Sequence, residues 1–289
     1  MLLPALVLLT LLVVVPLGLG TWTGFLNLNI STLHDWLLAP FVGLGNYREG
    51  FSGKALIGAS LGRSILASIE FSVLTTIVIA PIGILAALTV HGKFKGRTLV
   101  RSLYIVPYVI PTFVTALIGR LAFLNGTGAV DRLLSALHLA SSKTFWLIGS
   151  KSFWAMLLVE IWATWAFVYL MTLAGLQSIP HDLYESAEVD GAGSFRKFFS
   201  VVLPQLKRVL GIAFLLSTIG HFNNFTLPYV MFGQSPPNSA DVLPVNAYVT
   251  SFGVFEFGLG SAMAVVTMLV MIIPGVFYLR SLRLTEVTP

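Results

Sequence analysis

Six apolar runs constrain the fold of this chain more than any other feature of its sequence. Each is long enough to cross a hydrocarbon core of about 30 Å, which takes roughly 20 helical residues. They lie near residues 2–24, 65–90, 102–124, 152–177, 208–232 and 258–281. Hydrophobic residues make up 56% of the chain and charged residues only 10%, unlike a soluble domain. We therefore predict an all-α polytopic membrane protein in which residues 1–289 form one transmembrane domain of six helices.

The start of the chain and its lack of cysteine narrow this interpretation. Residues 2–19 are too long for the apolar core of a signal peptide and lack a clear small-residue cleavage site, so we interpret them as a transmembrane helix and leave open a native start upstream. Without cysteine there is no disulfide framework and no thiolate metal site. The histidines at 34, 91, 138, 181 and 221 lack metal-ligand spacing, so we expect no metal site.

Basic residues divide unequally between the two sets of loops that six spans create. One set holds ten: Lys93, Lys95, Arg97, Arg101, Arg196, Lys197, Lys207, Arg208, Arg280 and Arg283. The other holds six: Arg48, Lys54, Arg63, Arg132, Lys143 and Lys151. Because Lys and Arg favour cytoplasmic loops, we expect the larger set and both termini in the cytoplasm. This placement also explains the formal charge of +5 without nucleic-acid binding.

The three outer connections, near residues 25–64, 125–151 and 233–257, are too short for separate domains. The second contains VDRLLSALHL, which predicts a short helix. Prolines at 16, 81, 107, 111, 228 and 274 fall within apolar runs. Breaks of this kind are tolerated in membrane helices where neighbours or a cavity satisfy the freed backbone groups. We therefore expect kinked helices around a pathway.

Residues 178–204 form the longest polar and charged interval, on the predicted cytoplasmic side. Pro180 can begin a short helix, and Asp182, Glu185 and Glu188 place negative charge near its N-terminal end. An amphipathic helix here would turn its acidic residues to the cytoplasm. The side chains expected against the membrane domain are Leu183, Ala187 and Val189, and a sharp turn is expected at Gly191 and Gly193.

The same interval contains a spaced motif, E-x-A-x(3)-G-x(9)-[IV]-x-L-P. Its fixed positions are Glu185, Ala187, Gly191, Val201, Leu203 and Pro204. The motif resembles that of permease subunits of ATP-binding-cassette importers. This resemblance implies the type I importer fold, with a cytoplasmic coupling helix in residues 178–204 that docks on an ATPase. The implied coupling residues are Tyr184, Glu185, Ala187, Asp190, Gly191, Leu203 and Pro204, with Glu185 as the main polar contact and Gly191 at the turn.

Motifs for chemistry within the chain itself are weak. No G-x-x-x-x-G-K-[ST] occurs, so we expect no enzyme and no cofactor here, with ATP and Mg²⁺ bound by a partner ATPase. Residues 58–62, GASLG, match the G-x-S-x-G nucleophile elbow at Ser60. They lie in a polar outer segment without an Asp and His pair nearby, so a flexible lead into the second helix is preferred over an intramembrane hydrolase.

Ionisable residues inside apolar runs are costly and usually face a cavity or a partner. Glu70 and Arg120 lie near the outer ends of their helices, where they can pair or snorkel, so we expect structural roles. Glu160 and His221 lie deeper, ~12 and ~16 Å inward, and share a depth. Helical spacing groups Ser217 with His221 and Asn224, and Glu160 with Thr164 and Phe167. These stripes suit a sugar site, and hydrogen bonding between helices is an equal alternative.

Further segments resemble carbohydrate-uptake permeases from about residue 41 to the end. They are FVGLGNY at 41–47, RSLYIVPYVIPTF at 101–113, AGLQSIPHDLYESAEVDGAG at 174–193, GHFNNF at 220–225 and FGLGSAMA at 257–264. GHFNNF is similar to the corresponding helix of the larger maltose permease subunits. That similarity implies solute contacts at Glu160, Ala163, Thr164, Phe167, Ser217, His221 and Asn224.

The resemblance implies an importer of a maltose- or trehalose-type oligosaccharide in the cell (inner) membrane, working by alternating access. The implied partners are a second homologous permease, an ATPase dimer and an extracellular or periplasmic solute-binding protein. Two departures stand out, because FGQSPP at 232–237 replaces the usual Gly-Gly-Pro, and Glu160 and His221 are titratable. An importer of a glycerophosphodiester or amino sugar and, more remotely, an ion-driven secondary transporter stay open as alternatives.

Overall fold

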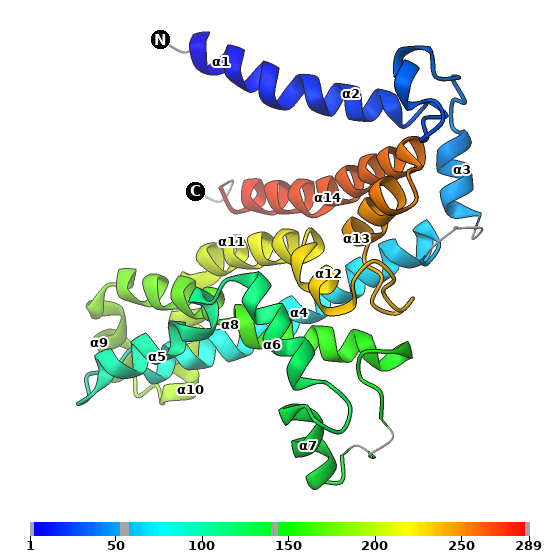
Figure 1. The fold of residues 1–289 in the computed structure, drawn as a ribbon. Helices are drawn as coiled ribbons and strands as arrows, with labels where there is room; N and C mark the ends of the chain where they lie inside the picture. The colour runs from blue at the N-terminus through cyan, green and yellow to red at the C-terminus, as the bar shows by residue number, and fades with distance from the viewer. Residues whose placement is uncertain (1–2, 53–57, 140, 142–143, 287–289) are drawn as a thin grey trace.

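The computed structural model describes residues 3–52, 58–139, 141 and 144–286, and helices dominate these ranges (Figure 1). Extended pairing within them is limited to a bridge between Leu26 and Phe41. The predicted all-α class is confirmed. In chain order the elements are α1 (Leu3–Leu9), η1 (Thr10–Val14), α2 (Val15–Thr23), η2 (Leu33–Leu38), α3 (Gly45–Phe51), α4 (Leu61–Thr89), α5 (Arg97–Val109), α6 (Thr112–Ala122), α7 (Ala129–Ala136), η3 (Gly149–Lys151), α8 (Ser152–Ser178), α9 (His181–Val189), α10 (Ser194–Lys197), η4 (Phe198–Val202), α11 (Leu203–Phe222), α12 (Thr226–Phe232), α13 (Leu243–Tyr248), η5 (Val249–Gly253) and α14 (Phe257–Glu286).

Among the described residues, five apolar segments are long enough to cross a membrane, and a sixth candidate is bent. The five are Leu3–Thr23, Leu61–Thr89, Gly149–Ser178, Ser194–Phe232 and Phe257–Val276. The run predicted near 102–124 is instead two helices, α5 and α6, that meet at 86°. Pro111 cannot continue the hydrogen bonds of α5 and restricts Ile110 before it to an extended conformation, which ends the helix there.

The helices α4 and α8 pack side by side at the centre of the molecule (Figure 1). Gly83 of α4 permits their close approach, since a β-carbon there would lie 2.7 Å from the backbone nitrogen of Tyr169. Gly119 of α6 lies equally close to α8, where a β-carbon would come within 2.6 Å of Val159 Cγ2. Small residues let membrane helices approach in this way. As a result α8 is held firmly between two neighbours.

The first span, formed by α1, η1 and α2, stands apart from the other helices (Figure 1). All its side chains from residue 3 to residue 20 are exposed. Its far end is tied to α14, because Thr23 Oγ1 lies 2.8 Å from Ser261 Oγ. An apolar helix satisfies its own backbone and is therefore stable in contact with lipid or with another membrane subunit.

Candidate functional site

A cavity of about 550 Å³ opens where two broken helices meet α8. One break separates α5 from α6, and the other separates α11 from α12. Irregular backbone is tolerated at membrane depth where it lines a cavity, so both breaks fit this position. The lining residues are Tyr108, Thr112, Glu160, Thr164, Phe167, Leu216, Ser217, Gly220, His221, Asn223, Asn224, Phe225 and Thr226.

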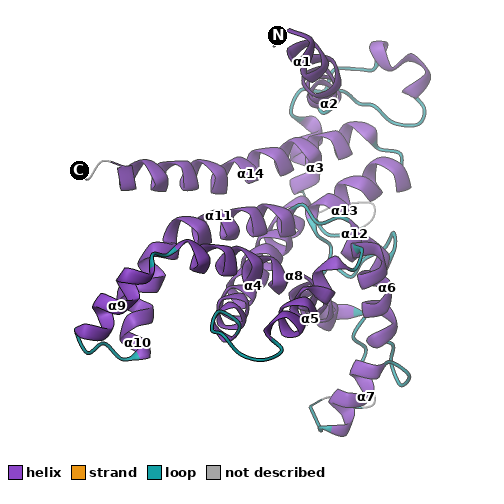
Figure 2. Cartoon of the chain, turned by 90° about the vertical axis from the view of Figure 1, so that its left-hand side faces the viewer, coloured by secondary structure: helices purple, strands orange, loops and turns teal. Residues whose placement is uncertain are grey.

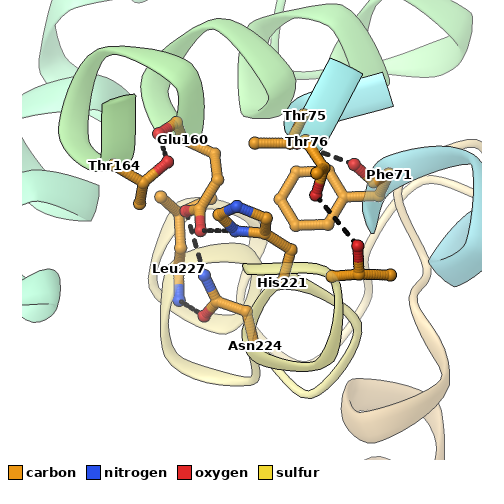
Figure 3. A network of polar contacts seen from close by, with 9 residues as sticks. Phe71, Thr75, Thr76, Glu160, Thr164, His221, Asn224 and Leu227 are labelled. Carbon is orange, nitrogen blue, oxygen red and sulfur yellow. Dashed lines mark hydrogen bonds and ion pairs between the residues drawn. The ribbon is translucent and has the colours of Figure 1, made fainter. Parts of the chain in front are cut away.

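Glu160 of α8 is the centre of a polar network in this cavity (Figure 3). Its Oε1 lies 2.8 Å from His221 Nδ1, and its Oε2 accepts a hydrogen bond from Asn224 Nδ2 at 2.9 Å. Glu160 and His221 are only 4% and 5% exposed. A charge taken out of water needs partners of this kind, and each oxygen of the carboxylate has one. The two residues predicted to share a depth are thus in direct contact.

Asn224 joins this network to the start of α12. Its side-chain oxygen accepts from the backbone N–H of Leu227 at 3.2 Å, while its amide nitrogen donates to Glu160. The helix α11 ends at Phe222, so Asn224 lies within the break itself. By contrast, the Thr164 hydroxyl donates to the Glu160 carbonyl one turn before it on the same helix, at 2.7 Å. The position of α12 is therefore coupled to the Glu160 carboxylate.

Two buried polar atoms in the cavity have no hydrogen-bond partner among the described residues, namely His221 Nε2 and Ser217 Oγ. They lie one helical turn apart on the same face of α11. Buried polar atoms are nearly always paired, so this pair marks a place for water or a ligand. When Nδ1 of a neutral His221 donates to Glu160, Nε2 is the acceptor. The cavity can therefore hydrogen-bond a hydroxylated solute.

Six of the seven predicted solute residues line this cavity, and Ala163 does not. Ala163 precedes Thr164 by one residue, which turns it about 100° away around α8. The sequence-based prediction missed Tyr108 and Thr112, which flank the break between α5 and α6, and Phe225 in the second break. The prolines of IVPYVIPT were the available signal, because they interrupt an apolar run.

Three other residues singled out in the sequence have structural contacts. Glu70 faces Arg63, with Oε2 and NH2 3.7 Å apart. Arg120 donates to the carbonyl of Val230 at 3.4 Å. Ser60 Oγ accepts from the backbone N–H of Arg63 at 3.4 Å and caps α4, which accounts for the serine of GASLG. Two of the outer basic residues in the orientation count, Lys54 and Lys143, lie outside the described residues.

Residues 178–204 form α9, α10 and η4, and α9 and α10 lie together at one end of the molecule (Figure 2). The predicted helix after Pro180 is α9. Tyr184 is half-buried and stacks on His91 at 6.3 Å between ring centroids, and burial raises the pKa of its hydroxyl. Ala187 is buried as predicted, at 7% exposure. Val189 was placed wrongly, since it is 88% exposed: two residues beyond Ala187, it points to the opposite face of α9.

The turn after α9 occurs at Gly191, whose φ of +71° is in the left-handed region that favours glycine. Gly193 has an ordinary φ of −64°, so of the two glycines only Gly191 needs this freedom. Lys197 Nζ donates to Glu188 at 2.8 Å, which holds α10 against α9 and lowers the pKa of Glu188. On the exposed face of α9, Glu185 Oε1 lies 3.1 Å from His181 Nδ1.

The other predicted coupling residues lie on either side of this turn. Asp190 follows α9 and is exposed. Leu203 is half-buried and packs with the core cluster between α8 and α11. Pro204 lies at the start of α11, directly after the π-turn η4, which interrupts the regular helical hydrogen-bond pattern just before the proline. The motif thus spans an exposed helix, a turn and the start of a spanning helix.

Apolar spans, helix breaks around a buried polar cavity and a short helix pair at one end together define a helical membrane permease. Residues 79–284 match the family described as the inner membrane component of binding-protein-dependent transport systems. The chain belongs to this family.

Relatives of known name support the assignment. Identity is 30% over 281 residues with the trehalose/maltose transport system permease protein MalF of Thermococcus litoralis, covering 97% of this chain and 91% of that protein. It is 32% over 285 residues with the sulfoquinovosyl glycerol transport system permease protein SmoG of Agrobacterium fabrum, covering 97% and 88%. A crystal structure of a bacterial ABC transporter that imports alginate superposes with a TM-score of 0.80 at 21% identity, covering 100% of this chain and 95% of that one, and shows the shared fold.

Proposed function

We propose that this chain is the membrane-spanning subunit of an ATP-driven importer of a trehalose- or maltose-type sugar, and that it works by alternating access. The observation that supports this best is the buried network of Glu160, His221 and Asn224, beside which His221 Nε2 and Ser217 Oγ lack partners. Sugar hydroxyls would pair with these two atoms. The rings of Tyr108 and Phe167, 6.1 Å apart, would cover the apolar faces of a sugar.

Transport in this proposal needs partners that supply energy and solute. Residues 178–204 would dock on a separate ATPase that binds ATP and Mg²⁺, with Glu185 as the exposed charged contact and Gly191 shaping the turn. A second permease would complete the pathway and a solute-binding protein would deliver the sugar on the outer side. Both termini and α9 would then lie in the cytoplasm. Closure of the ATPase would move α9 and α10 as a unit, because Lys197 and Glu188 join them.

The alternatives gain no support from the cavity. A glycerophosphodiester would bring a negative charge, but none of the lining residues is Lys or Arg. An amino sugar would need an acidic group, and the only one in the lining, Glu160, is 4% exposed and already holds His221 and Asn224. A sugar without charge therefore suits the lining best. Proton coupling through Glu160 and His221 would leave the exposed coupling motif without a role.

The test is uptake of labelled trehalose or maltose into proteoliposomes that contain this chain together with the proposed second permease, ATPase and binding protein. Uptake that requires both ATP and the binding protein is expected. Ser217→Ala should reduce the rate, because a sugar hydroxyl loses its partner. The matched control is Thr218→Ala, since that neighbouring hydroxyl already pairs with Phe214 and Thr76. Equal rates for both variants and the wild type would reject the cavity as the solute site.

A further inference from the structure

A second charged feature lies in the connection between α4 and α5, on the predicted cytoplasmic side. We call residues 91–98, HGKFKGRT, the basic loop; it contains Lys93, Lys95 and Arg97 and no acidic residue. Arg101 follows one turn into α5. A depression of about 420 Å³ lies within the loop, lined by Lys93, Phe94, Gly96, Arg97 and Thr98.

Contacts within the protein fix two of these cations without neutralising them. Arg97 NH1 donates to the carbonyls of His91 and Gly92 at 3.5 and 3.4 Å, and Arg101 donates to the carbonyl of Val90 at 2.9 Å. None of the ion pairs found among the described residues includes Lys93, Lys95, Arg97 or Arg101. The basic loop and Arg101 thus hold four positive charges, and no carboxylate of the described residues is paired with them.

The pKa of His91, within the basic loop, responds to the same positive charges. Its pKa is lowered first by burial and then by the charges of Arg101 and Arg97. The His91 ring, which stacks on Tyr184 of α9, is therefore harder to protonate beside these two guanidinium groups. An anion would be attracted to this place.

An apolar stripe on α5 continues from the cations. Leu99, Leu103 and Val106 are 65%, 57% and 51% exposed and lie on one face of the helix. On another face, Val100 and Tyr104 pack with the core cluster between α4, α8 and α11. One continuous surface therefore has cations at its end and hydrocarbon along its length.

We propose that the basic loop and this stripe bind one anionic phospholipid, with its phosphate at Lys93, Lys95 and Arg97 and an acyl chain along Leu99, Leu103 and Val106. Clusters of Lys and Arg directly beside a membrane helix favour anionic lipid head groups. Phe94, 45% exposed between the two lysines, favours a bilayer interface over an acidic protein surface. The site rests on the orientation given under the proposed function, and it does not depend on the solute.

The test uses the full chain purified in micelles of phosphatidylglycerol and phosphatidylcholine, with retained lipid counted by native mass spectrometry. The wild type should retain phosphatidylglycerol preferentially. The double variant Lys93→Gln, Lys95→Gln should lose this preference by roughly ten- to thirty-fold, from the usual effect of two juxtamembrane cations. The matched control, Lys207→Gln with Arg208→Gln, removes the same charge from exposed positions on α11 and should keep the preference.

Each alternative outcome overturns the lipid site. Equal phosphatidylglycerol retention by the wild type and the Lys93→Gln, Lys95→Gln variant would show that these lysines do not bind the lipid. Loss of ATPase binding by the same variant would then assign the basic loop to the ATPase instead. Loss in the Lys207, Arg208 control to the same extent would reveal a general charge effect. Displacement of the lipid by excess inorganic phosphate would indicate a free-phosphate site. A Lys93→Arg, Lys95→Arg variant should restore the preference, and its failure would rule out the charge as the cause.

Discussion

Replacing Glu160 by leucine removes the acceptor for two donors at once. His221 Nδ1, at 2.8 Å, and Asn224 Nδ2, at 2.9 Å, would both lose their partner, and of the two residues His221 is buried and Asn224 half-buried. An unsatisfied buried donor such as His221 Nδ1 costs about 1–3 kcal/mol, and the half-buried Asn224 adds less than that. His221 would also lose the contact that fixes the orientation of its ring. We therefore expect Glu160→Leu to abolish uptake almost completely.

Glu160→Gln tests the same network with less disturbance. Glutamine keeps the shape and one accepting oxygen, but its amide nitrogen must face either His221 or Asn224, so one donor is lost rather than two. A cost of about 1–3 kcal/mol, if felt fully at the rate-limiting step, slows uptake roughly five- to 150-fold. Changed sugar selectivity would have the same origin. Assembly with the partner subunits should stay intact.

The assay measures sugar uptake in proteoliposomes, co-purification of the partner subunits and thermal unfolding for both variants. Glu70→Gln is the matched control, because it makes the same chemical change in a half-exposed pair with Arg63 away from the cavity. If both Glu160 variants assemble and transport the same sugar at the wild-type rate, the solute site around Glu160 must be abandoned. Poor expression of both would instead indicate a purely structural Glu160.

Three further changes test other parts of the molecule. Gly191→Val puts a branched side chain at φ +71°, which costs about 1–2 kcal/mol of strain, so transport should fall while affinity for the binding protein stays unchanged. Gly193→Val, at φ −64°, is the control. Normal uptake by the Gly191→Val variant would show that the turn at Gly191 is not needed for coupling. Glu185→Lys reverses an exposed charge and should weaken ATPase binding or uncouple hydrolysis, and unchanged values for both would remove Glu185 from docking. Asp241, 1% exposed in the connection between α12 and α13, accepts from Ala59 N–H at 2.7 Å, and burial raises its pKa from 3.8 to about 7. Between these two pKa values the folded state holds a proton that the unfolded state releases. The unfolding free energy of the wild type relative to Asp241→Asn should therefore fall by about 1.4 kcal/mol per pH unit from about pH 4 to pH 7 and level off above. The same pH dependence of the unfolding free energy in both proteins would contradict this.

The lengths of the apolar runs predicted the helical class and the spans. The thickness of the hydrocarbon core sets a minimum number of consecutive apolar residues, and this number can be read from the sequence. The break between α5 and α6 was only hinted at by Pro107 and Pro111. Pro107 remains inside α5, whereas Pro111 ends that helix, and sequence alone does not say which proline kinks and which breaks. That choice depends on whether neighbours satisfy the freed backbone groups, which is a tertiary property.

The sequence likewise predicted a common depth for Glu160 and His221, and the family resemblance implied that their helices lie together. They could not show that Asn224 would occupy the other carboxylate oxygen, or that Tyr108 would reach the cavity from a separate helix. On α9, amphipathic pattern placed Ala187 correctly and Val189 incorrectly. An apolar side chain at the last position of a short helix carries little information, since the turn that follows decides its surroundings.

The most direct test of the central claim is a cryo-electron microscopy map of the assembled transporter with trehalose or maltose bound at membrane depth. Our interpretation predicts sugar density in the cavity between α8 and α11, with hydroxyls within hydrogen-bonding distance of His221 Nε2 and Ser217 Oγ, and with the contact between Glu160 and His221 retained. Sugar bound elsewhere in the pathway, with water or nothing beside those two atoms, would contradict it.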